Sequence, residues 1–369
     1  MPATVHLIAA ARPNFMKVAP LYHALKASGD FTPRIVHTGQ HYDFNMSDAF
    51  FVDLGLPEPD YHLNVGGGTH AEQVGNVMIA YEKVAMADRP DWLVVVGDVN
   101  STVACAMVGA KLWIPVVHLE AGLRSRDRRM PEEINRLATD VLADVLWTPS
   151  PDGDENLANE GIPAERITRV GNIMLDSYEL LRERIEAENA PARFGLEPGT
   201  YGIVTLHRPS NVDQKETLEP LVAQLEKAAA RLPLIFPVHP RTRKKLHDFG
   251  LWARLEAAGL TLVEPVSYRP FMSLVSNARL CITDSGGIQE ETTYLDIPCL
   301  TLRENTERPI TILEGTNRLV KPERLVEAVE TVLGGQWPSG RRPDLWDGKT
   351  AQRCVEDLRR RTALRQAAE

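Results

Sequence analysis

Cysteine is scarce in this chain of 369 residues, which has four of them and no C-x-x-C pair. The four are widely scattered, and Cys281 and Cys299 each lie in an apolar run typical of a buried strand. Such positions favour small buried residues over a disulfide framework. We therefore expect the protein to work in a reducing compartment.

Long apolar runs are also missing, and no stretch approaches the ~20 residues that a helix needs to cross a bilayer. The first ten residues, MPATVHLIAA, have no basic residue before their short apolar run and do not resemble a signal peptide. Positive charge is in deficit, because the formal net charge is -9. The sequence thus predicts a cytoplasmic protein with no overall attraction to nucleic acid or to a membrane.

Several cofactor and nucleophile motifs are absent. There is no G-x-x-x-x-G-K-[ST] loop and no G-x-G-x-x-G after a strand, since GGGTHAE at Gly66 has the wrong spacing. A P-loop kinase or ATPase and a tightly bound NAD are therefore not expected. No cluster has metal-ligand spacing and no G-x-S-x-G elbow occurs, so neither zinc nor a serine or cysteine nucleophile is expected.

The composition is that of an ordinary globular protein, with 43% hydrophobic and 25% charged residues. Continuous apolar runs, typical of strands covered on both faces, alternate with helical stretches. This alternation predicts an α/β fold with parallel, doubly wound sheets. The expected strands are residues 5–10, 34–37, 92–96, 116–119, 145–148, 202–206, 234–238, 260–263, 280–283 and 299–302. The expected helices include residues 71–87, 131–143, 218–231 and 287–295.

The alternation falters at residues 170–198, where a charged helix leads into prolines and glycines. We place a domain boundary near Gly171. Residues 1–171 and 172–351 are then expected to form two Rossmann-like domains that face each other across a cleft. A C-terminal helix over residues 352–369 is expected to pack back on the first domain.

The segment TDSGGIQEE, residues 283–291, is the strongest local signal. An apolar strand ends in it, and a helix begins directly after Gly286 and Gly287. Glycines let the backbone approach an anion closely, and a helix amino terminus offers free N–H groups with a positive partial charge. We interpret the segment as a phosphate site, with a hydroxyl from Ser285 and with Glu291 on a ribose hydroxyl. The alternative is an ordinary capped βα turn.

Charged residues also follow strands of the first domain. Arg12 and Lys17 come after the first strand, where ligands of open α/β sheets bind, although each alone is typical of a solvated surface charge. Asp98 in GDVNST and Glu120 in HLEAGLRS stand at the ends of neighbouring strands. Helix capping is the alternative role for Asp98.

The segment MPEEINR places Glu132 and Glu133 in the first turn of a helix, where complementing the helix dipole is the simplest role. Carboxylates that converge on one site tend to raise a pKa among them. A neutral acid and a charged base can then coexist near pH 7. The pattern of carboxylates in the first domain is therefore consistent with acid–base chemistry.

Histidines follow two strands of the second domain. His207 and Arg208 in TLHRPSN come directly after a strand, where His207 either donates to a diphosphate or is an ordinary histidine at a strand end. His239 in PVHPRTRKK has an equivalent place, and there a solvated basic loop is the favoured interpretation.

The order of these motifs along nearly the whole chain resembles that of the non-hydrolysing UDP-N-acetylglucosamine 2-epimerases. The motifs are ARPNFMK, GQH at Gly39, GDVNST, HLEAGLR, MPEEINR, GN at Gly171, TLHRP, PVHPR, TDSGGIQEE and TERP at Thr306. Each motif alone is weak, but the ordered set is highly specific. The resemblance implies the two-domain GT-B architecture, a UDP-sugar substrate, no cofactor and a homodimer.

Members of this family eliminate UDP and add it back. A base removes the C2 proton of the sugar while the anomeric C–O bond breaks, which gives UDP and a 2-acetamidoglucal. By matching motif, the resemblance implies that the catalytic residues are Asp98, Glu120, Glu132 and His207. It also implies that the UDP-sugar is bound by Arg12, Lys17, Arg136, Arg208, His239, Phe271, Ser285, Gly286, Gly287, Glu291 and Arg308.

The chain departs from the family pattern at some positions. Asn14 replaces a glutamate, and Pro209 stands where many members carry a second arginine. Some members are activated by their own substrate through that arginine region and the GQH motif. Gln40 and His41 of this motif are present here, so they are possible regulatory residues, whereas Pro209 departs from the pattern of this regulation.

The basic segment RSRDRRMPEE bears on the identity of the sugar. A solvated basic loop is the favoured interpretation, and recognition of a negatively charged sugar is the alternative. Such a sugar would be that of a UDP-2,3-diacetamido-glucuronic acid. The arginines concerned are Arg124, Arg126, Arg128 and Arg129.

Three competing functions are a GT-B glycosyltransferase, a hydrolysing epimerase and a catalytically silent UDP-sugar-binding protein. Retaining transferases of this architecture often carry two glutamates eight positions apart in the second domain. The positions eight after Glu290 and Glu291 are Pro298 and Cys299, so this signature is absent. The carboxylates of the first domain favour the epimerase over the transferase, and a silent binding protein is disfavoured by the presence of Asp98, Glu120, Glu132 and His207. All three competing functions rank behind the epimerase.

Overall fold

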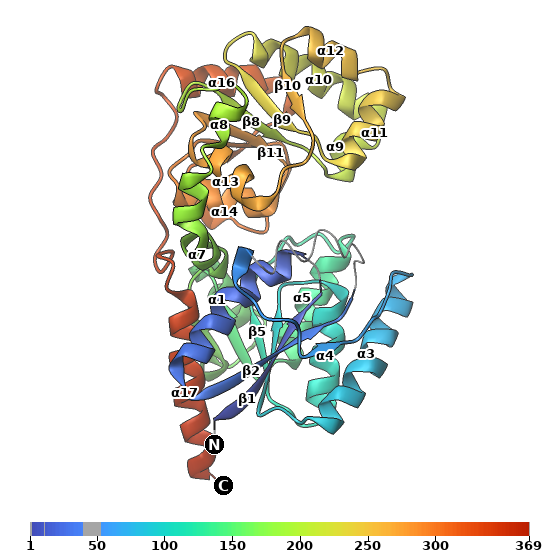
Figure 1. Cartoon of the computed structure of the whole chain (residues 1–369), viewed down its shortest axis with the longest axis vertical. Coiled ribbons are helices and arrows are strands. Elements are labelled where there is room, and N and C mark those ends of the chain that lie inside the picture. The colour runs from blue at the N-terminus through green and yellow to red at the C-terminus, as the bar shows by residue number, and fades with distance from the viewer. Residues whose placement is uncertain (1, 11, 40–52, 369) are drawn as a thin grey trace. The chain divides into compact units, whose positions relative to one another are not determined.

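The computed structural model describes residues 2–10, 12–39 and 53–368, without the side chains of residues 12, 13 and 368 (Figure 1). The chain forms two compact units. The first consists of Met1–Leu180 with Asp344–Glu369, and the second of Leu181–Pro343. Within the described ranges, no helix is both long and apolar enough to cross a membrane.

The first unit is built on a parallel sheet with the order β3-β2-β1-β4-β5-β6-β7. Helix α1 packs against α17, and α3, α4 and α5 pack in a row on the opposite side of the sheet (Figure 1). The strands are β1 (Ala3–Ala9), β2 (Phe31–His37), β3 (Tyr61–His62), β4 (Trp92–Val96), β5 (Val116–Leu119), β6 (Val145–Thr148) and β7 (Ile167–Arg169). The helices are α1 (Arg12–Ser28), α3 (His70–Ala87), α4 (Asn100–Lys111), α5 (Pro131–Leu142), α6 (Pro151–Asn159), the first part of α7 (Ile173–Ala187) and α17 (Thr350–Ala368).

The second unit has a parallel sheet with the order β10-β9-β8-β11-β12-β13. Its strands are β8 (Gly202–Thr205), β9 (Leu234–Pro237), β10 (Thr261–Val263), β11 (Leu280–Thr283), β12 (Cys299–Thr301) and β13 (Asn317–Leu319). Its helices are α8 (Ala190–Arg193), α9 (Pro209–Val212), α10 (Lys215–Ala229), α11 (Pro240–Asp248), α12 (Trp252–Ala257), α13 (Tyr268–Ser276), α14 (Gly286–Tyr294), α15 (Ile310–Leu313) and α16 (Leu325–Leu333).

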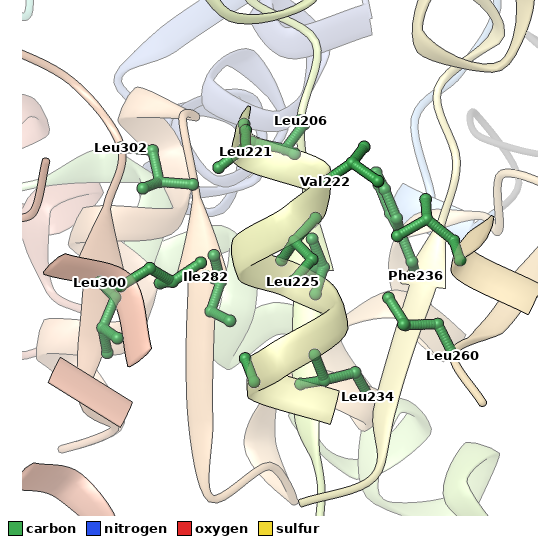
Figure 2. Packing of buried hydrophobic residues seen from close by; sticks show 14 of the residues in the cluster. Leu206, Leu221, Val222, Leu225, Leu234, Phe236, Leu260, Ile282, Leu300 and Leu302 are labelled. Carbon is green, nitrogen blue, oxygen red and sulfur yellow. The ribbon is translucent and has the colours of Figure 1, made fainter. Parts of the chain in front are cut away.

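Helix α10 packs against one face of the second sheet. Leu221 and Leu225 of this helix belong to one buried cluster with Leu234, Phe236 and Ile282 of the strands (Figure 2). A large aliphatic side chain gains about 1.5–3 kcal/mol when it is moved from water into such a core. Burial of this apolar surface holds the sheet and its helices together as one unit.

The prediction of an α/β fold with parallel sheets is confirmed, and the ten strands expected from the sequence all occur. Every residue of β4, β5 and β6 is buried, as continuous apolar runs in a doubly covered sheet require. Sequence patterns do not predict β3, β7 and β13. These strands have only two or three residues, are partly exposed and lie at sheet edges, so they leave no long apolar run.

The division between the units falls inside α7, after Leu180, whereas the sequence places it near Gly171. The start of α7 is held by the first unit, because the Ser177 hydroxyl donates to the Met16 carbonyl. The segment before α17 also belongs to this unit, since the Trp346 indole N–H donates to the Pro149 carbonyl at 2.9 Å. A glycine-rich break in the pattern therefore does not coincide with the point where packing changes from one sheet to the other.

Helix α17 is tied to the first unit by Asp357. This carboxylate accepts hydrogen bonds from Trp147 Nε1 at 2.8 Å and from Thr168 Oγ1 at 3.2 Å. Burial favours a raised pKa for Asp357, but hydrogen bonds from Trp147, Arg361 and Arg360 outweigh burial and lower the pKa. The group therefore stabilises the fold in its ionised form.

We predict that Asp357→Ala lowers the free energy of unfolding by about 2–3 kcal/mol near neutral pH, because the buried Trp147 N–H loses its acceptor. The wild-type advantage is present above the ordinary carboxyl pKa and is lost as pH falls through the lowered pKa of Asp357. Urea unfolding of both proteins between about pH 7 and pH 3 measures this difference. The control is Glu356→Ala, which changes an exposed carboxylate on the same helix. Equal effects of the two variants would contradict the role of Asp357.

Candidate active site

The segments that carry Asp98 and Glu120 both follow carboxyl ends of strands in the sheet of the first unit. Strands β4 and β5 are hydrogen-bonded neighbours with Val96 opposite Leu119, so Asp98 and Glu120 follow adjacent strand ends. Glu120 adopts a φ of 71°, in a region that side chains other than glycine enter at a cost. Its backbone N–H donates to the Trp147 carbonyl at 3.1 Å, which helps to hold this conformation.

The carboxylate of Glu120 lies in a small polar cluster. It forms an ion pair with Lys17 of α1, and the Glu120 side chain is 4% exposed. Its other oxygen, Oε1, is buried and has no hydrogen-bond partner within the described residues. Gly97 opens onto this pair, since a Cβ there would lie 3.5 Å from Lys17 Nζ and 3.6 Å from Glu120 Oε2. A buried carboxylate with one unengaged oxygen is suited to exchange a proton with a ligand.

Asp98 is held by Arg136 of α5. The Nε and Nη2 atoms of Arg136 donate to Asp98 Oδ2 at 3.0 and 2.6 Å, and Nη1 donates to Glu133 Oε2 at 2.6 Å. The Asn135 amide donates to the Asp98 carbonyl at 2.9 Å. These contacts fix the turn after β4, while the Asp98 side chain stays 33% exposed and open to a ligand.

The two glutamates at the start of α5 have different surroundings. Glu133 is buried and accepts hydrogen bonds from the backbone N–H groups of Ser125 and Arg126 at 2.9 and 2.8 Å. Burial favours a raised pKa for Glu133, but these bonds and Arg136 outweigh burial and lower the pKa. Glu132 is half-buried, and the described part of the chain gives it no hydrogen bond or ion pair. Glu133 therefore anchors a loop, and Glu132 is the one available for chemistry.

A buried His–Asp pair, which motif reasoning misses, stands behind this edge. His118 Nδ1 lies 2.6 Å from Asp140 Oδ1, and Nε2 lies 2.8 Å from the Gly97 carbonyl oxygen. Asp140 also accepts from the Gly122 N–H at 3.1 Å and pairs with Arg124 at 2.7 Å. Burial opposes ionisation of Asp140, but His118 and Arg124 outweigh it and lower its pKa. Positions 133, 136 and 140 have the spacing of one helix face, and this spacing is the sequence signal that could have drawn attention to Asp140.

The expectation of a solvated basic loop is wrong for Arg124. Its side chain is 2% exposed and pairs with Asp140 and Glu160. Arg129 is paired with Asp127 on the surface, and Arg128 is exposed. Arg124 is thus a structural residue, held by two carboxylates.

Asp284 organises the corresponding edge of the second unit. It follows β11, which pairs with β8, and it accepts the backbone N–H groups of His207 and Arg208 at 3.1 and 2.9 Å. Its Oδ1 lies 3.0 Å from His207 Nδ1, which leaves Nε2 as the ring nitrogen for a ligand. Burial opposes ionisation of Asp284, but the contacts with His207, Arg208 and Asn211 outweigh it and lower its pKa.

Helix α14 begins beside this histidine-bearing edge. Ser285 is its N-cap residue, and the Ser285 side chain makes no capping hydrogen bond. A Cβ at Gly287 would meet nothing within 4 Å, so the backbone is open to an approaching group there. Free N–H groups, open space and the helix dipole together make this turn suited to an anion.

Glu291, one turn further along α14, is a buried carboxyl group. Its Oε1 accepts from the Tyr268 hydroxyl at 2.9 Å. Burial, with an added contribution from Glu290, raises the pKa of Glu291 to about 8. In the unliganded protein this group is therefore mostly a neutral acid at pH 7.

The remaining predicted residues have varied positions. His239 is the N-cap of α11, where its Nδ1 accepts from the Arg241 N–H at 3.2 Å, and its ring centroid lies 5.7 Å from that of His207. His239 is exposed, in agreement with the expected solvated position, although it lies at the start of a helix and not within a loop. Phe271 is half-buried in α13. Gln40, His41 and the side chain of Arg12 lie outside the described residues.

The profile of the family described as UDP-N-acetylglucosamine 2-epimerase matches residues 23–359. The chain belongs to this family. One relative, the UDP-N-acetylglucosamine 2-epimerase of Methanocaldococcus jannaschii, is 42% identical over 95% of this chain and 98% of its own length.

Two further comparisons extend this result. The crystal structure of the Methanocaldococcus jannaschii UDP-GlcNAc 2-epimerase in complex with UDP-GlcNAc and UDP has a TM-score of 0.86 and covers 96% of this chain and 99% of that one. This likeness confirms the GT-B class of fold. The UDP-2,3-diacetamido-2,3-dideoxy-D-glucuronate 2-epimerase of Pseudomonas aeruginosa is 39% identical over 89% of this chain and 91% of its length. Proteins similar to this chain are thus named for a neutral and for an acidic sugar.

We predict that Glu291→Gln increases the stability of the unliganded protein over that of the wild type more at pH 8 than at pH 5. The folded state holds the Glu291 proton up to about pH 8. The contribution of this group to stability is therefore full below the ordinary carboxyl pKa, and it is lost as pH rises from that value through the raised pKa of about 8. Glutamine keeps the shape and is neutral throughout. The difference in melting temperature between variant and wild type should therefore rise with pH, as calorimetry would measure. The exposed Glu256→Gln is the control, and a difference that does not change with pH would contradict the raised pKa.

Proposed function

We propose that the protein catalyses the reversible C2 epimerisation of UDP-N-acetylglucosamine to UDP-N-acetylmannosamine. The observation that carries the proposal is the buried Glu120 carboxylate, with one oxygen on Lys17 and the other unengaged, in a chain of this enzyme family. The crystal structure of the relative in complex with UDP-GlcNAc and UDP supports the choice of substrate.

The nucleotide part of the substrate is assigned to the second unit. The diphosphate would accept hydrogen bonds from the N–H groups of Gly286 and Gly287, the Ser285 hydroxyl and His207 Nε2. This assignment is supported by the open backbone at Gly287 and by the way Asp284 occupies the other ring nitrogen of His207. Glu291 is assigned to the ribose hydroxyls and the Phe271 backbone to uracil. Arg12, Arg208, His239 and Arg308 are the further candidates for the diphosphate.

The chemical step is assigned to the carboxylates of the first unit. A carboxylate takes the C2 proton, the C–H electron pair forms the C1=C2 double bond, and the C1–O pair leaves with UDP. The resulting 2-acetamidoglucal is protonated at C2 on its other face, and UDP adds back at C1. Asp98, Glu120 and Glu132 are the candidates for the acid and base. Because a C2 proton is very weakly acidic, donors to the leaving diphosphate must supply much of the stabilisation.

We further infer that the enzyme works in the cytoplasm as a homodimer. The four cysteines are buried and none of them is in a disulfide, which fits a reducing compartment. We also propose a regulatory role for Gln40 and His41, in which the substrate activates the enzyme.

We predict that the purified protein with UDP-N-acetylglucosamine in deuterated water forms the manno isomer and incorporates deuterium at C2 in both UDP-sugars. Proton NMR without added cofactor measures both events. Glu120→Gln should lower the exchange rate by about 100-fold or more, since a neutral amide cannot take the proton. Glu155→Gln, on α6 and exposed, is the control. Wild-type protein that neither exchanges nor epimerises would reject the proposal, and transfer of the sugar to an acceptor would indicate a glycosyltransferase instead.

The second candidate is epimerisation of a UDP-diacetamido-glucuronic acid. It is favoured by the Pseudomonas aeruginosa relative and by the exposed Arg128 close in sequence to Glu132. On this hypothesis the uronic substrate should have the higher kcat/KM, and Arg128→Ala should lower kcat/KM about tenfold for that substrate alone. A preference of the wild type for the neutral sugar, unchanged in Arg128→Ala, would exclude it.

A further inference from the structure

A carboxylate without an assigned role lies against the first residue of α14. Glu307, in the TERP segment, is 4% exposed. A Cβ on Gly286 would lie 2.7 Å from Glu307 Oε1, which is closer than two such atoms can approach. A side chain at position 286 would therefore require the Glu307 carboxylate to move from its place. The negative charge is favourable at the positive end of the helix, but it stands beside the turn assigned to an anionic diphosphate.

Two arginines hold Glu307 in place. Arg303 Nη2 donates to Glu307 Oε2 at 2.8 Å, and Arg308 Nη1 lies 3.3 Å from Oε1. The side chains of Arg303 and Arg308 are 9% and 11% exposed. Burial opposes ionisation of Glu307, but Arg308 and Arg303 outweigh it and lower its pKa well below the usual range. Glu307 is therefore a fixed negative charge between two cations.

Arg308 is held at a second point by α14 itself. Its Nε lies 2.8 Å from Oε1 of Glu290, a residue that is 2% exposed. Two carboxylates, Glu290 and Glu307, thus balance Arg303 and Arg308, and the cluster adds little net charge near the helix start. Its effect on a bound anion must come from geometry. An arginine fixed before the ligand arrives loses less side-chain entropy on binding than a mobile one.

We propose that Glu307, anchored by Arg303, is a positioning residue that fixes the guanidinium of Arg308 beside the start of α14 for the diphosphate of the UDP-sugar. The inference rests on the proposed function, because it takes the diphosphate to bind at this turn. Arg308 would meet the diphosphate in the substrate and in released UDP alike. Loss of its position should therefore weaken binding of both more than it slows the chemical step.

The first test replaces the charge and keeps the shape. Glu307→Gln should raise the Kd for UDP, measured by titration calorimetry, and the KM for the UDP-sugar about tenfold each, with kcat changed less than about threefold. The matched control is Glu330→Gln in the same unit, whose partner Arg231 lies at 2.8 Å with both side chains 51% exposed. A Kd for UDP in Glu307→Gln equal to that of the control would overturn the inference.

A double-mutant cycle separates positioning from a general loss of structure. Gly286→Ala should displace the Glu307 carboxylate and raise the Kd for UDP about as much as Glu307→Ala does. In the Glu307→Ala protein the methyl group introduced at position 286 has space, so adding Gly286→Ala to this variant should change the Kd for UDP less than about twofold. An equal factor in both backgrounds would overturn the inference. Wild-type protein that binds no UDP would reject the proposed function as well, whereas normal UDP binding with no coupling rejects the inference alone.

Discussion

Parallel pairing of neighbouring strands is the constraint on which the functional parts of both units depend. In the first unit the backbone hydrogen bonds place Val96 beside Leu119, so the turns that carry Asp98 and Glu120 begin at the same edge. In the second unit Thr205 lies beside Thr283, and His207 meets Asp284 for the same reason. The backbone ladder, and not attraction between the side chains, determines which residues can meet.

The buried charges then fall into two groups with different physical behaviour. Glu133, Asp140 and Glu307 each accept from an arginine and are held ionised, so their desolvation is offset by fixed partners. Glu120 keeps one oxygen without a partner within the described residues, and burial raises the pKa of Glu291. The first group shapes loops and helix starts. The second group retains capacity for a ligand or a proton, which is the usual mark of a functional carboxyl group.

Much of this arrangement follows from sequence patterns, because apolar runs mark strands and the residues after them reach one edge. That logic predicts the positions of Asp98, Glu120 and His207. It does not separate Glu132 from Glu133, since both occupy the first turn of α5 and only the loop at Ser125 and Arg126 decides which one is used structurally.

The burial of Arg124 and the space taken by Glu307 beside Gly286 are likewise results of tertiary packing. Neither has a local sequence pattern, because the partners lie on other elements. The position of the division within α7 is also a result of tertiary packing. Contacts of α7 with α1 and α17 keep the start of this helix in the first unit, although a glycine precedes the helix.

The state of the thiols has a practical consequence for spectroscopy. All four cysteines are fully buried and unpaired, and burial raises the pKa of Cys105 and Cys354. Thiol-directed dyes react with accessible thiolates, so the natural chain is nearly silent towards them. A single cysteine introduced on the surface would therefore carry a fluorophore or spin label without removal of the native ones. With one such label, the local environment of a chosen surface position can be followed as UDP is added.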